Sequence, residues 1–329
     1  MLAWPGRLRA LGHAVFFACA ATLSVSAVAE TIEARSPLDI FQQQEDLLFQ
    51  TGYRLAKENA PFCERRTFSL GLLIHDAASY GQPEAVRAHF GLLGDIGVQS
   101  VAMGSPAEAA GILQNDSLLS VSGQEVESLA RPGDEAWARA ARIAKLLESP
   151  ALDGKLRVSF RNAQVEKSQI ELAPVELCSS RFELRSGTSK ASADGERVLI
   201  GDSFPAFSYS TPKFAAALAH EMAHNLLGHL DYLDRHGRGG GRVRASERDA
   251  DRLMPWLLFN AGYDPQAAVD FMEEWGPRHG GGILRKRSHD GWDERVEFIA
   301  AELPKIEEVA VDGKADWRSH FQPVLVEKE

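Results

Sequence analysis

A five-residue motif on an alanine-rich segment constrains this chain more than any other feature. Residues 211–229 read TPKFAAALAHEMAHNLLGH, in which His220, Glu221 and His224 form the pattern H-E-x-x-H. The four alanines before the motif favour a helix, and the threonine and proline that open the segment are typical of a helix start. Side chains four residues apart lie on one face of a helix. His220 and His224 can therefore offer two imidazole nitrogens to one metal ion.

Glu221 supplies the acidic group of the motif. It is rotated by about 100° around the helix axis from His220, so it can reach a metal-bound water without binding the metal itself. A zinc ion lowers the pKa of such a water to about 7, and a neighbouring carboxylate can take the proton as the water attacks a peptide carbonyl. The alternative interpretation is that two core histidines and a glutamate share this spacing by chance.

A catalytic zinc ion takes three protein ligands and keeps one position open, so a third ligand must follow the motif. His229 gives an H-E-x-x-H-x-x-x-x-H spacing, but we expect it to face solvent or the helix end, where a cation is favoured. His236 opens a Gly- and Arg-rich stretch, residues 236–244, that predicts a mobile loop. We favour Glu247 as the ligand, with Asp251 on the same face of a second helix orienting a ligand histidine. A solvated acidic face is the alternative.

Two further features concern the elements around this site. Pro255 falls inside the second helix and predicts a kink or a stop. Residues 197–202, RVLIGD, predict a strand that leads into the first helix. Such a strand either lies at a sheet edge and binds the substrate backbone by strand addition, or it is an ordinary core strand.

The order H-E-x-x-H and then E-x-x-A-D resembles the M48 family of zinc metallopeptidases, which contains the Ste24 and HtpX proteases. Residues 260–268, NAGYDPQAA, are similar to the turn into the next helix of that family. Residues 288–295, SHDGWDER, are similar to its S-H-P-x-x-x-x-R element, with Asp290 in place of proline. The resemblance implies that His289 and Arg295 lie near the zinc site, where they contact substrate or order the acidic groups. A loop histidine is the alternative for His289.

Residues 91–176 indicate a second module that resembles a bacterial PDZ domain. The resemblance rests on GSPAEAAGI at residues 104–112, a turn and short helix, and on NDSLLSVSG at residues 115–123, a strand and turn. Asn115 stands where glycine is usual, and asparagine tolerates a left-handed backbone. A first strand is expected at residues 97–101, a helix at 135–147 and closing strands at 156–160 and 169–172.

PDZ domains bind an extended peptide as an added strand. The resemblance implies a β-barrel or sandwich with a peptide-binding loop just before the first strand, formed by Gly94, Asp95, Ile96 and Gly97. Asp95 would disfavour a peptide carboxylate at this loop. The alternative is that the module only packs against the rest of the chain or shields it.

The first 29 residues predict a secretory signal peptide that is cleaved after Ala29. Arg7 and Arg9 precede a run of apolar and small residues, and Ala27-Val28-Ala29 is an A-x-A site. An uncleaved anchor is the alternative. Cleavage would leave no stable membrane span and would shift the net charge from −10 to −12. That acidity argues against nucleic acid or an anionic membrane surface as a partner.

Cys63 and Cys178 are the two cysteines that remain after cleavage. In an exported protein, two cysteines are a candidate disulfide. Two free buried thiols are the alternative, since free cysteine is often buried.

These features together predict an α+β chain. Its parts are the signal peptide (1–29), an N-terminal helical part of the peptidase (30–90), the PDZ-like module (91–176) and the metallopeptidase domain (177–329). The resemblance implies a mostly helical gluzincin-type core with a small edge sheet and one zinc ion per chain.

The expected function is that of a zinc-dependent endopeptidase of the periplasm or cell exterior, acting on exported or misfolded envelope proteins. His220, His224 and Glu247 would bind zinc, and Glu221 would act as the base. One alternative is a PDZ-centred peptide-binding or chaperone-like protein with a latent or structural zinc site. Another is a zinc hydrolase that acts on a non-peptide cell-wall substrate.

Overall fold

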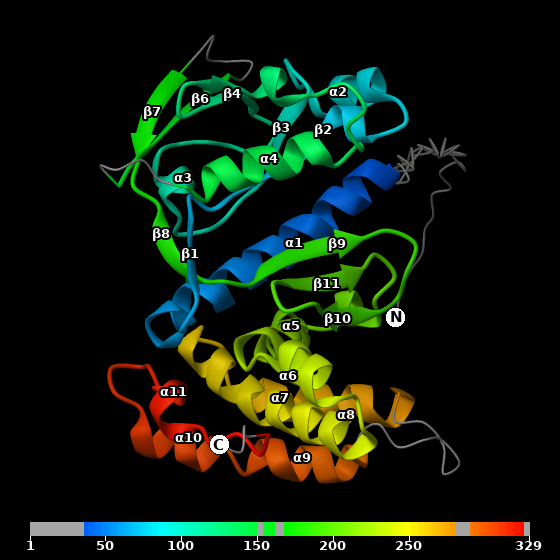
Figure 1. The fold of residues 1–329 in the computed structure, drawn as a ribbon, viewed down its shortest axis with the longest axis vertical. Coiled ribbons are helices and arrows are strands. Elements are labelled where there is room, and N and C mark those ends of the chain that lie inside the picture. The colour runs from blue at the N-terminus through cyan, green and yellow to red at the C-terminus, as the bar shows by residue number, and fades with distance from the viewer. Residues whose placement is uncertain (1–35, 150–153, 162–167, 280–289, 326–329) are drawn as a thin grey trace, which may run out of the picture. The chain divides into compact units, whose positions relative to one another are not determined.

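The computed structural model of the protein describes residues 36–149, 154–161, 168–279 and 290–325. The predicted signal peptide, with its cleavage site after Ala29, and His289 lie outside these ranges. Helices and several small sheets mix within the described chain (Figure 1), as expected for an α+β protein. No helix in the described part is both long and apolar enough to cross a membrane.

The bounds of the elements follow the chain from its N-terminal side. The α-helices are α1 (Pro37–Asn59), α2 (Pro83–Phe90), α3 (Pro106–Ala109), α4 (Ala138–Leu147), α5 (Thr211–Leu226), α6 (His229–His236), α7 (Gly240–Asn260), α8 (Gln266–His279), α9 (Trp292–Ala300), α10 (Leu303–Val309) and α11 (Trp317–His320). The strands are β1 (Arg66–Ser69), β2 (Leu72–Asp76), β3 (Ile96–Val101), β4 (Ser117–Val121), β5 (Gln124–Glu125), β6 (Leu156–Arg161), β7 (Ser168–Leu172), β8 (Val175–Cys178), β9 (Arg181–Arg185), β10 (Ala191–Ala193) and β11 (Arg197–Gly201).

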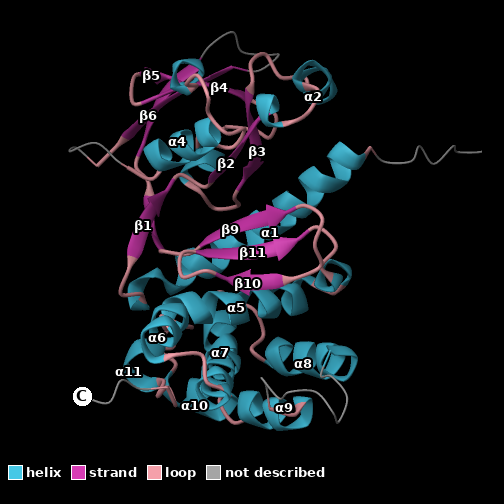
Figure 2. Cartoon of the chain, turned by 45° about the vertical axis from the view of Figure 1, so that its right-hand side comes forward, coloured by secondary structure: helices cyan, strands magenta, loops and turns pink. Residues whose placement is uncertain are grey.

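Helix α5 carries the H-E-x-x-H motif and lies at the centre of the larger apolar core. The sheet of order β10-β11-β9 packs on one side of α5, and α7 and α8 pack on the other (Figure 2). The alanines of α5 are buried and, having no bulk beyond Cβ, let these neighbours approach closely. The helix ends at Leu226, three residues before the expected end, because Gly228 adopts a left-handed backbone with φ 65°. The chain then restarts as α6.

Helix α7 departs from the sequence-based expectation at both of its ends. The stretch 236–244 was expected to be a loop, but α6 ends at His236 and α7 already begins at Gly240. Pro255 does not stop the helix, which continues to Asn260. Pro255 and its neighbours Met254 and Trp256 are buried, so tertiary packing holds a turn that lacks one backbone donor.

A six-stranded antiparallel sheet has the order β2-β3-β4-β6-β7, with β5 paired to β4. Asn115 has φ 69°, the left-handed conformation that the sequence predicts at this turn. The sheet takes in β2, which precedes the boundary expected at residue 91, because β2 pairs with β3 along its whole length. The expected barrel or sandwich is not formed, since the sheet is open and β2 and β7 end its strand order.

The six-stranded sheet is joined to α1 through polar side chains. Gln42 donates to the side chain of Asn115 at 2.9 Å, and Gln50 donates to the carbonyl of Val101 at 2.7 Å. Ser100 donates to Asp46 at 2.6 Å. The sheet has apolar cores of its own, separate from the core around α5. The two parts therefore meet through hydrogen bonds, while each buries its own apolar residues.

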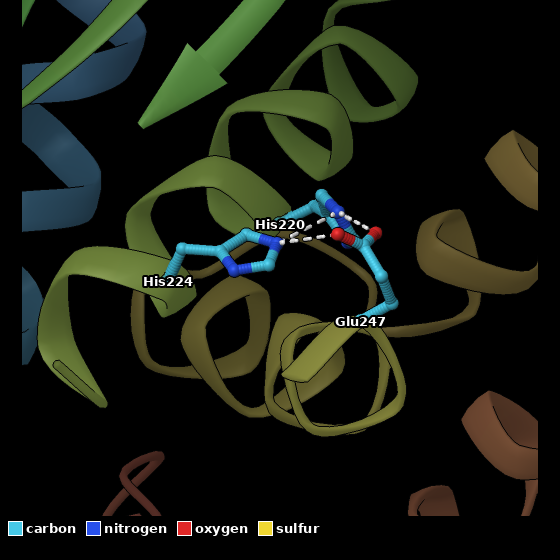
Figure 3. A group of neighbouring side chains, drawn as sticks. All are labelled: His220, His224 and Glu247. Atoms are coloured by element: carbon cyan, nitrogen blue, oxygen red, sulfur yellow. Dashed lines mark hydrogen bonds and ion pairs between the residues drawn. The ribbon is translucent and has the colours of Figure 1, made fainter. Parts of the chain in front are cut away.

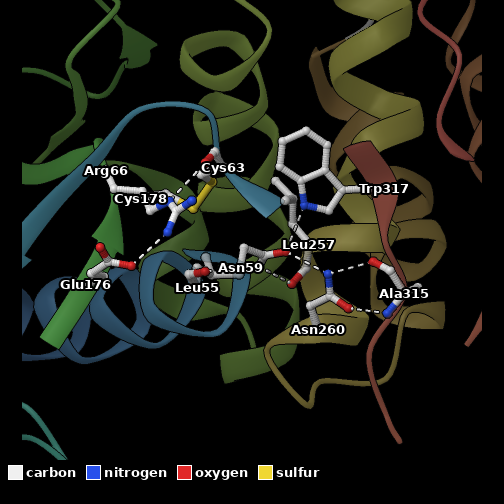
Figure 4. Close-up of a disulfide and its surroundings, with 10 residues drawn as sticks. All are labelled: Leu55, Asn59, Cys63, Arg66, Glu176, Cys178, Leu257, Asn260, Ala315 and Trp317. Atoms are coloured by element: carbon white, nitrogen blue, oxygen red, sulfur yellow. Dashed lines mark hydrogen bonds and ion pairs between the residues drawn. A yellow bond between two sulfur atoms is a disulfide. The ribbon is translucent and has the colours of Figure 1, made fainter. Parts of the chain in front are cut away.

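Strands β1 and β8 carry the chain into and out of the six-stranded sheet, and they pair with each other. Cys63 precedes β1, Cys178 ends β8, and the two form a disulfide with a Cα–Cα distance of 5.5 Å (Figure 4). The predicted disulfide is therefore confirmed. It closes the base of the inserted segment, where both of its connecting strands meet.

Asn59, at the end of α1, fastens the same region to the helical core (Figure 4). Its side-chain amide donates to the carbonyl of Leu257 at 3.1 Å. Its carbonyl oxygen accepts from Asn260 at 2.9 Å and from the indole of Trp317 at 3.2 Å. These buried groups satisfy one another, as buried polar groups must.

We expect the Cys63→Ser/Cys178→Ser double variant to be markedly less stable than the wild type. The disulfide closes a loop with a sequence separation of 115 residues. Loop-closure entropy predicts a loss of about 4–5 kcal/mol in the free energy of unfolding. Urea denaturation followed by circular dichroism measures it. Reduced wild type should match the double variant, and a loss below about 1 kcal/mol would contradict the expectation.

Candidate metal centre

His220, His224 and Glu247 converge from two helices (Figure 3). The histidines come from α5 and the glutamate from α7, which packs against it. The Nε2 atoms of His220 and His224 lie 3.3 Å apart. The Glu247 carboxylate oxygens lie 3.5 Å from Nε2 of His220 and 3.7 Å from Nε2 of His224. Among the described residues, this is the group of side chains that could share one metal ion.

These separations suit a tetrahedral zinc ion. With Zn–N and Zn–O bonds of about 2.0–2.2 Å, tetrahedral ligand atoms lie roughly 3.3–3.6 Å from one another. The separations of 3.3 and 3.5 Å fall in this range, and the 3.7 Å separation between Oε1 of Glu247 and Nε2 of His224 lies just outside it. Two imidazoles and one carboxylate form a donor set that zinc accepts, and three protein ligands leave one position for water or substrate. The residues present therefore fit the ion that the sequence predicts.

Asp251 and Arg295 form a second layer behind His220. Asp251 is fully buried, and its Oδ1 lies 3.1 Å from Nδ1 of His220. This contact is off the line of the N–H bond, so it is an ion-pair contact rather than an aligned hydrogen bond. Arg295, from α9, donates from Nε and Nη2 to the two oxygens of Asp251 at 2.6 and 2.7 Å. Both residues singled out by the sequence thus lie beside the three candidate ligands.

The charges in this layer change the protonation of His220. Burial alone would lower the pKa of His220, but the Asp251 and Glu247 carboxylates outweigh burial and raise it to about 10. Burial likewise would raise the pKa of Asp251, but Arg295 and His220 hold it below its usual value. In the metal-free protein, His220 therefore carries a proton at neutral pH, and a metal ion must displace that proton.

His229 lies in the site, which contradicts the expectation that it faces solvent. It is 2% exposed, and its Nδ1 lies 2.9 Å from Nδ1 of His224. The cause is the left-handed backbone of Gly228, which reverses the chain at the end of α5. The His229 side chain therefore packs against His224. His236, the other histidine considered as a ligand, instead packs against Tyr232 at the end of α6, with ring centroids 4.4 Å apart.

The three candidate ligands line a pocket of about 880 Å³ together with Glu221. One wall is formed by β10 and the residues before it, 189–193. Strand β11, which covers the sequence RVLIG, pairs with β9 on one side and β10 on the other, so it is a core strand. The sheet edge beside the pocket is therefore β10.

The pocket is also lined by aromatic residues that no sequence motif singled out. Trp275 packs against Phe204 and Phe271, with ring centroids 5.2 and 5.8 Å apart, and Trp292 also lines the pocket. Phe271 and Trp275 come from one face of α8, whereas Phe204 follows β11 and Trp292 begins α9, so the sequence does not show that the four lie together. Asp290, which replaces the expected proline, accepts from Arg248 at 2.9 and 3.1 Å and lies in the same pocket.

Of the four residues expected to form a peptide-binding loop, Ile96 and Gly97 lie in β3, inside the six-stranded sheet, and Gly94 and Asp95 come directly before it. Ile96 and Gly97 pair with β2, and Gly97 also pairs with β4. Strand β3 has β2 on one side and β4 on the other, so it cannot accept a further strand. The Asp95 carboxylate binds Arg87 and Arg139, and the Asp95 backbone N–H donates to the carboxylate of Glu127 at 3.2 Å. The unpaired sheet edge on this side belongs to β2.

Comparison with known proteins gives no assignment. Neither the protein-family models nor the curated proteins include a match to this chain. Any function must therefore be argued from the residues and their geometry.

We expect zinc binding to release a proton and to strengthen as the pH rises. His220 must lose its proton before Nε2 can bind a metal, and its raised pKa keeps it protonated at neutral pH. Below that pKa, affinity should rise roughly tenfold per pH unit. Isothermal titration calorimetry in buffers of different ionisation enthalpy counts the released protons.

Asp251→Asn provides the control, because it removes the carboxylate that favours protonated His220. Proton release should fall in this variant. A wild type that binds zinc with the same affinity from pH 6 to pH 8 would contradict the assignment of the raised pKa to His220.

Proposed function

We propose that the protein is a zinc-dependent endopeptidase. The observation that carries the proposal is the convergence of His220, His224 and Glu247 at tetrahedral spacing on a pocket that also contains Glu221. When bound, a zinc ion would polarise the scissile carbonyl and lower the pKa of the attacking water. A purely structural zinc site is closed by four protein ligands and needs no further carboxylate.

Glu221 is the general base in this proposal. It follows His220 directly, so it projects from α5 at a different angle and enters the pocket without joining the ligand set. From there it takes a proton from the attacking water and later passes it to the leaving amine. Asp251 holds His220 in place, and Arg295 compensates the buried charge of Asp251.

Strand β10 provides the means to hold an extended substrate. It is an edge strand of its sheet and lines the pocket that contains Glu221. A peptide added to this edge would gain backbone hydrogen bonds that do not depend on its sequence. Such binding suits a protease of unfolded chains better than a hydrolase of non-peptide cell-wall material.

The six-stranded sheet is proposed to be a PDZ-like peptide-binding module whose groove lies between β2 and α4. Helix α4 contacts β2 (Figure 1), and Arg139 near its start donates to Asp76 at the end of β2 at 2.6 Å. Leu72, Leu73 and Ile74 of β2 are only partly buried. An extended peptide added there would place the binding loop at residues 70–72 instead of 94–97.

The resemblance to the M48 metallopeptidases and the location outside the cytoplasm belong to the same proposal. The resemblance is supported by the second-layer positions of Asp251 and Arg295. Export is supported by the Cys63–Cys178 disulfide, since disulfides persist in oxidising compartments. The proposed substrates are exported or misfolded proteins. A PDZ-centred binding protein with a latent zinc site is the competing function. The free edge of β2 favours this function as much as it favours a peptidase with a peptide-binding module.

We expect Glu221→Gln to abolish cleavage of an unfolded protein substrate while zinc remains bound. The amide cannot accept the proton of the attacking water, which should lower kcat by about 10²–10⁴-fold. Cleavage of casein followed by gel electrophoresis measures activity, and metal analysis measures zinc.

Glu273→Gln is the matched control, because Glu273 lies exposed on α8 outside the pocket lining. It should cleave at the wild-type rate. Equal cleavage by the wild type and Glu221→Gln would contradict the role of Glu221 as the base. An absence of cleavage by the zinc-loaded wild type would favour the PDZ-centred peptide-binding protein.

We expect a bound peptide to slow amide hydrogen exchange in β2 and not at residues 94–97. Peptides of diverse C-terminal sequence would be screened against the full chain, and the tightest binder used for exchange measured by mass spectrometry. Protection at residues 94–97 without protection of β2 would place the peptide elsewhere, and an absence of binders would argue that the module only packs or shields.

A further inference from the structure

The two candidate ligand histidines have different partners on the side away from the metal position. Nδ1 of His220 faces the carboxylate of Asp251. Nδ1 of His224 faces Nδ1 of His229 at 2.9 Å, which is hydrogen-bonding distance. A carboxylate only accepts hydrogen bonds, whereas a neutral imidazole nitrogen either donates or accepts, depending on its tautomer. The second contact therefore has two possible directions.

The direction of this hydrogen bond decides whether His224 can bind a metal. Nε2 of His224 is the atom that faces His220 and Glu247, so its lone pair must be free. A neutral imidazole with a free Nε2 carries its proton on Nδ1. In the opposite direction, His229 donates, His224 carries its proton on Nε2, and no lone pair faces the metal.

We propose that His229 is a positioning residue of the metal centre, whose Nδ1 accepts the Nδ1 proton of His224 and so keeps Nε2 of His224 directed at the metal. The inference rests on the proposed function, since it concerns the same zinc site. Metal-binding histidines usually donate their other N–H group to a carboxylate, a carbonyl or water. Here a third histidine takes that place.

The surroundings of His229 fix the position of its ring against His224. The ring is buried, and its Nε2 has no hydrogen-bond partner among the described residues. When Nδ1 accepts, Nε2 must carry the proton of the neutral ring, and this buried N–H then has no partner among the described residues, a cost that metal binding by His224 has to offset. The first turn of α6 and the left-handed Gly228 hold the ring against His224, with ring centroids 4.9 Å apart. His229 thus has one polar contact, and that contact is with a ligand.

The test compares His229→Leu with His229→Asn, two side chains of similar shape. Asparagine retains an oxygen close to the position of Nδ1 and can accept the His224 proton, whereas leucine cannot. Zinc affinity is measured by competition with a chromophoric chelator, and the melting temperature of the metal-free protein reports folding. We expect leucine to weaken zinc binding by about 10–100-fold and asparagine to restore most of that loss.

Three results would overturn the inference. Equal affinity losses in two folded variants would show that only the ring volume matters, and unchanged affinity in His229→Leu would show that the contact does not matter. Failure of the wild type to bind zinc would remove the proposed function together with the inference, so the two failures are distinguishable.

A measurement on the wild type covers the case in which the variants do not fold. Long-range ¹H–¹⁵N correlation spectra of the zinc-bound chain report the tautomer of each histidine ring. We expect a proton on Nδ1 of His224 and on Nε2 of His229. A proton on Nδ1 of His229 would overturn the assignment.

Discussion

The close packing of α5 against α7 is the constraint on which the candidate site depends. It brings His220 and His224 within reach of Glu247 and encloses Asp251 completely. A buried carboxylate without a partner is strongly destabilising, because its desolvation is not compensated. Arg295 must therefore dock from α9, and three helices become interdependent around one pair of charges. The alanines of α5 serve this arrangement, since larger side chains would hold the helices too far apart for the ligand atoms to meet.

The rest of the chain contains a free sheet edge beside the pocket and another in the six-stranded sheet. Strand β10 lies along the pocket, and β2 ends the six-stranded sheet. The chain enters the six-stranded sheet through β1 and leaves it through β8, and the disulfide joins the bases of these two strands. The sheet contacts α1 mainly through hydrogen bonds. An interface of this kind, more polar than a core, permits relative movement more readily than an apolar one. Both edges suit an extended chain, which is why an unfolded protein is the substrate class that we propose.

The sequence revealed those parts of the site that depend on local geometry. Helical periodicity placed His220 beside His224 and Glu247 beside Asp251, and two lone cysteines indicated the disulfide. Asn115 stands where the PDZ resemblance expects glycine, and its backbone is left-handed as that position requires. The errors have one local cause and several long-range ones. A single left-handed residue, Gly228, ends α5 early and returns His229 to the site, while tertiary burial carries α7 through Pro255. The pairing of β2 with β3 places the free sheet edge at β2, outside the expected bounds of the module. The aromatic residues of the pocket come from α8, α9 and the turn after β11, which meet only in the folded chain.

The proposed function requires that one zinc ion be bound by the atoms that converge between α5 and α7. Anomalous diffraction from crystals grown with zinc, measured above and below the zinc absorption edge, tests this directly. We expect one strong anomalous peak per chain within bonding distance of Nε2 of His220, Nε2 of His224 and the Glu247 carboxylate. Glu221 should lie beside the fourth, open ligand position. A peak elsewhere, or none at saturating zinc, would contradict it.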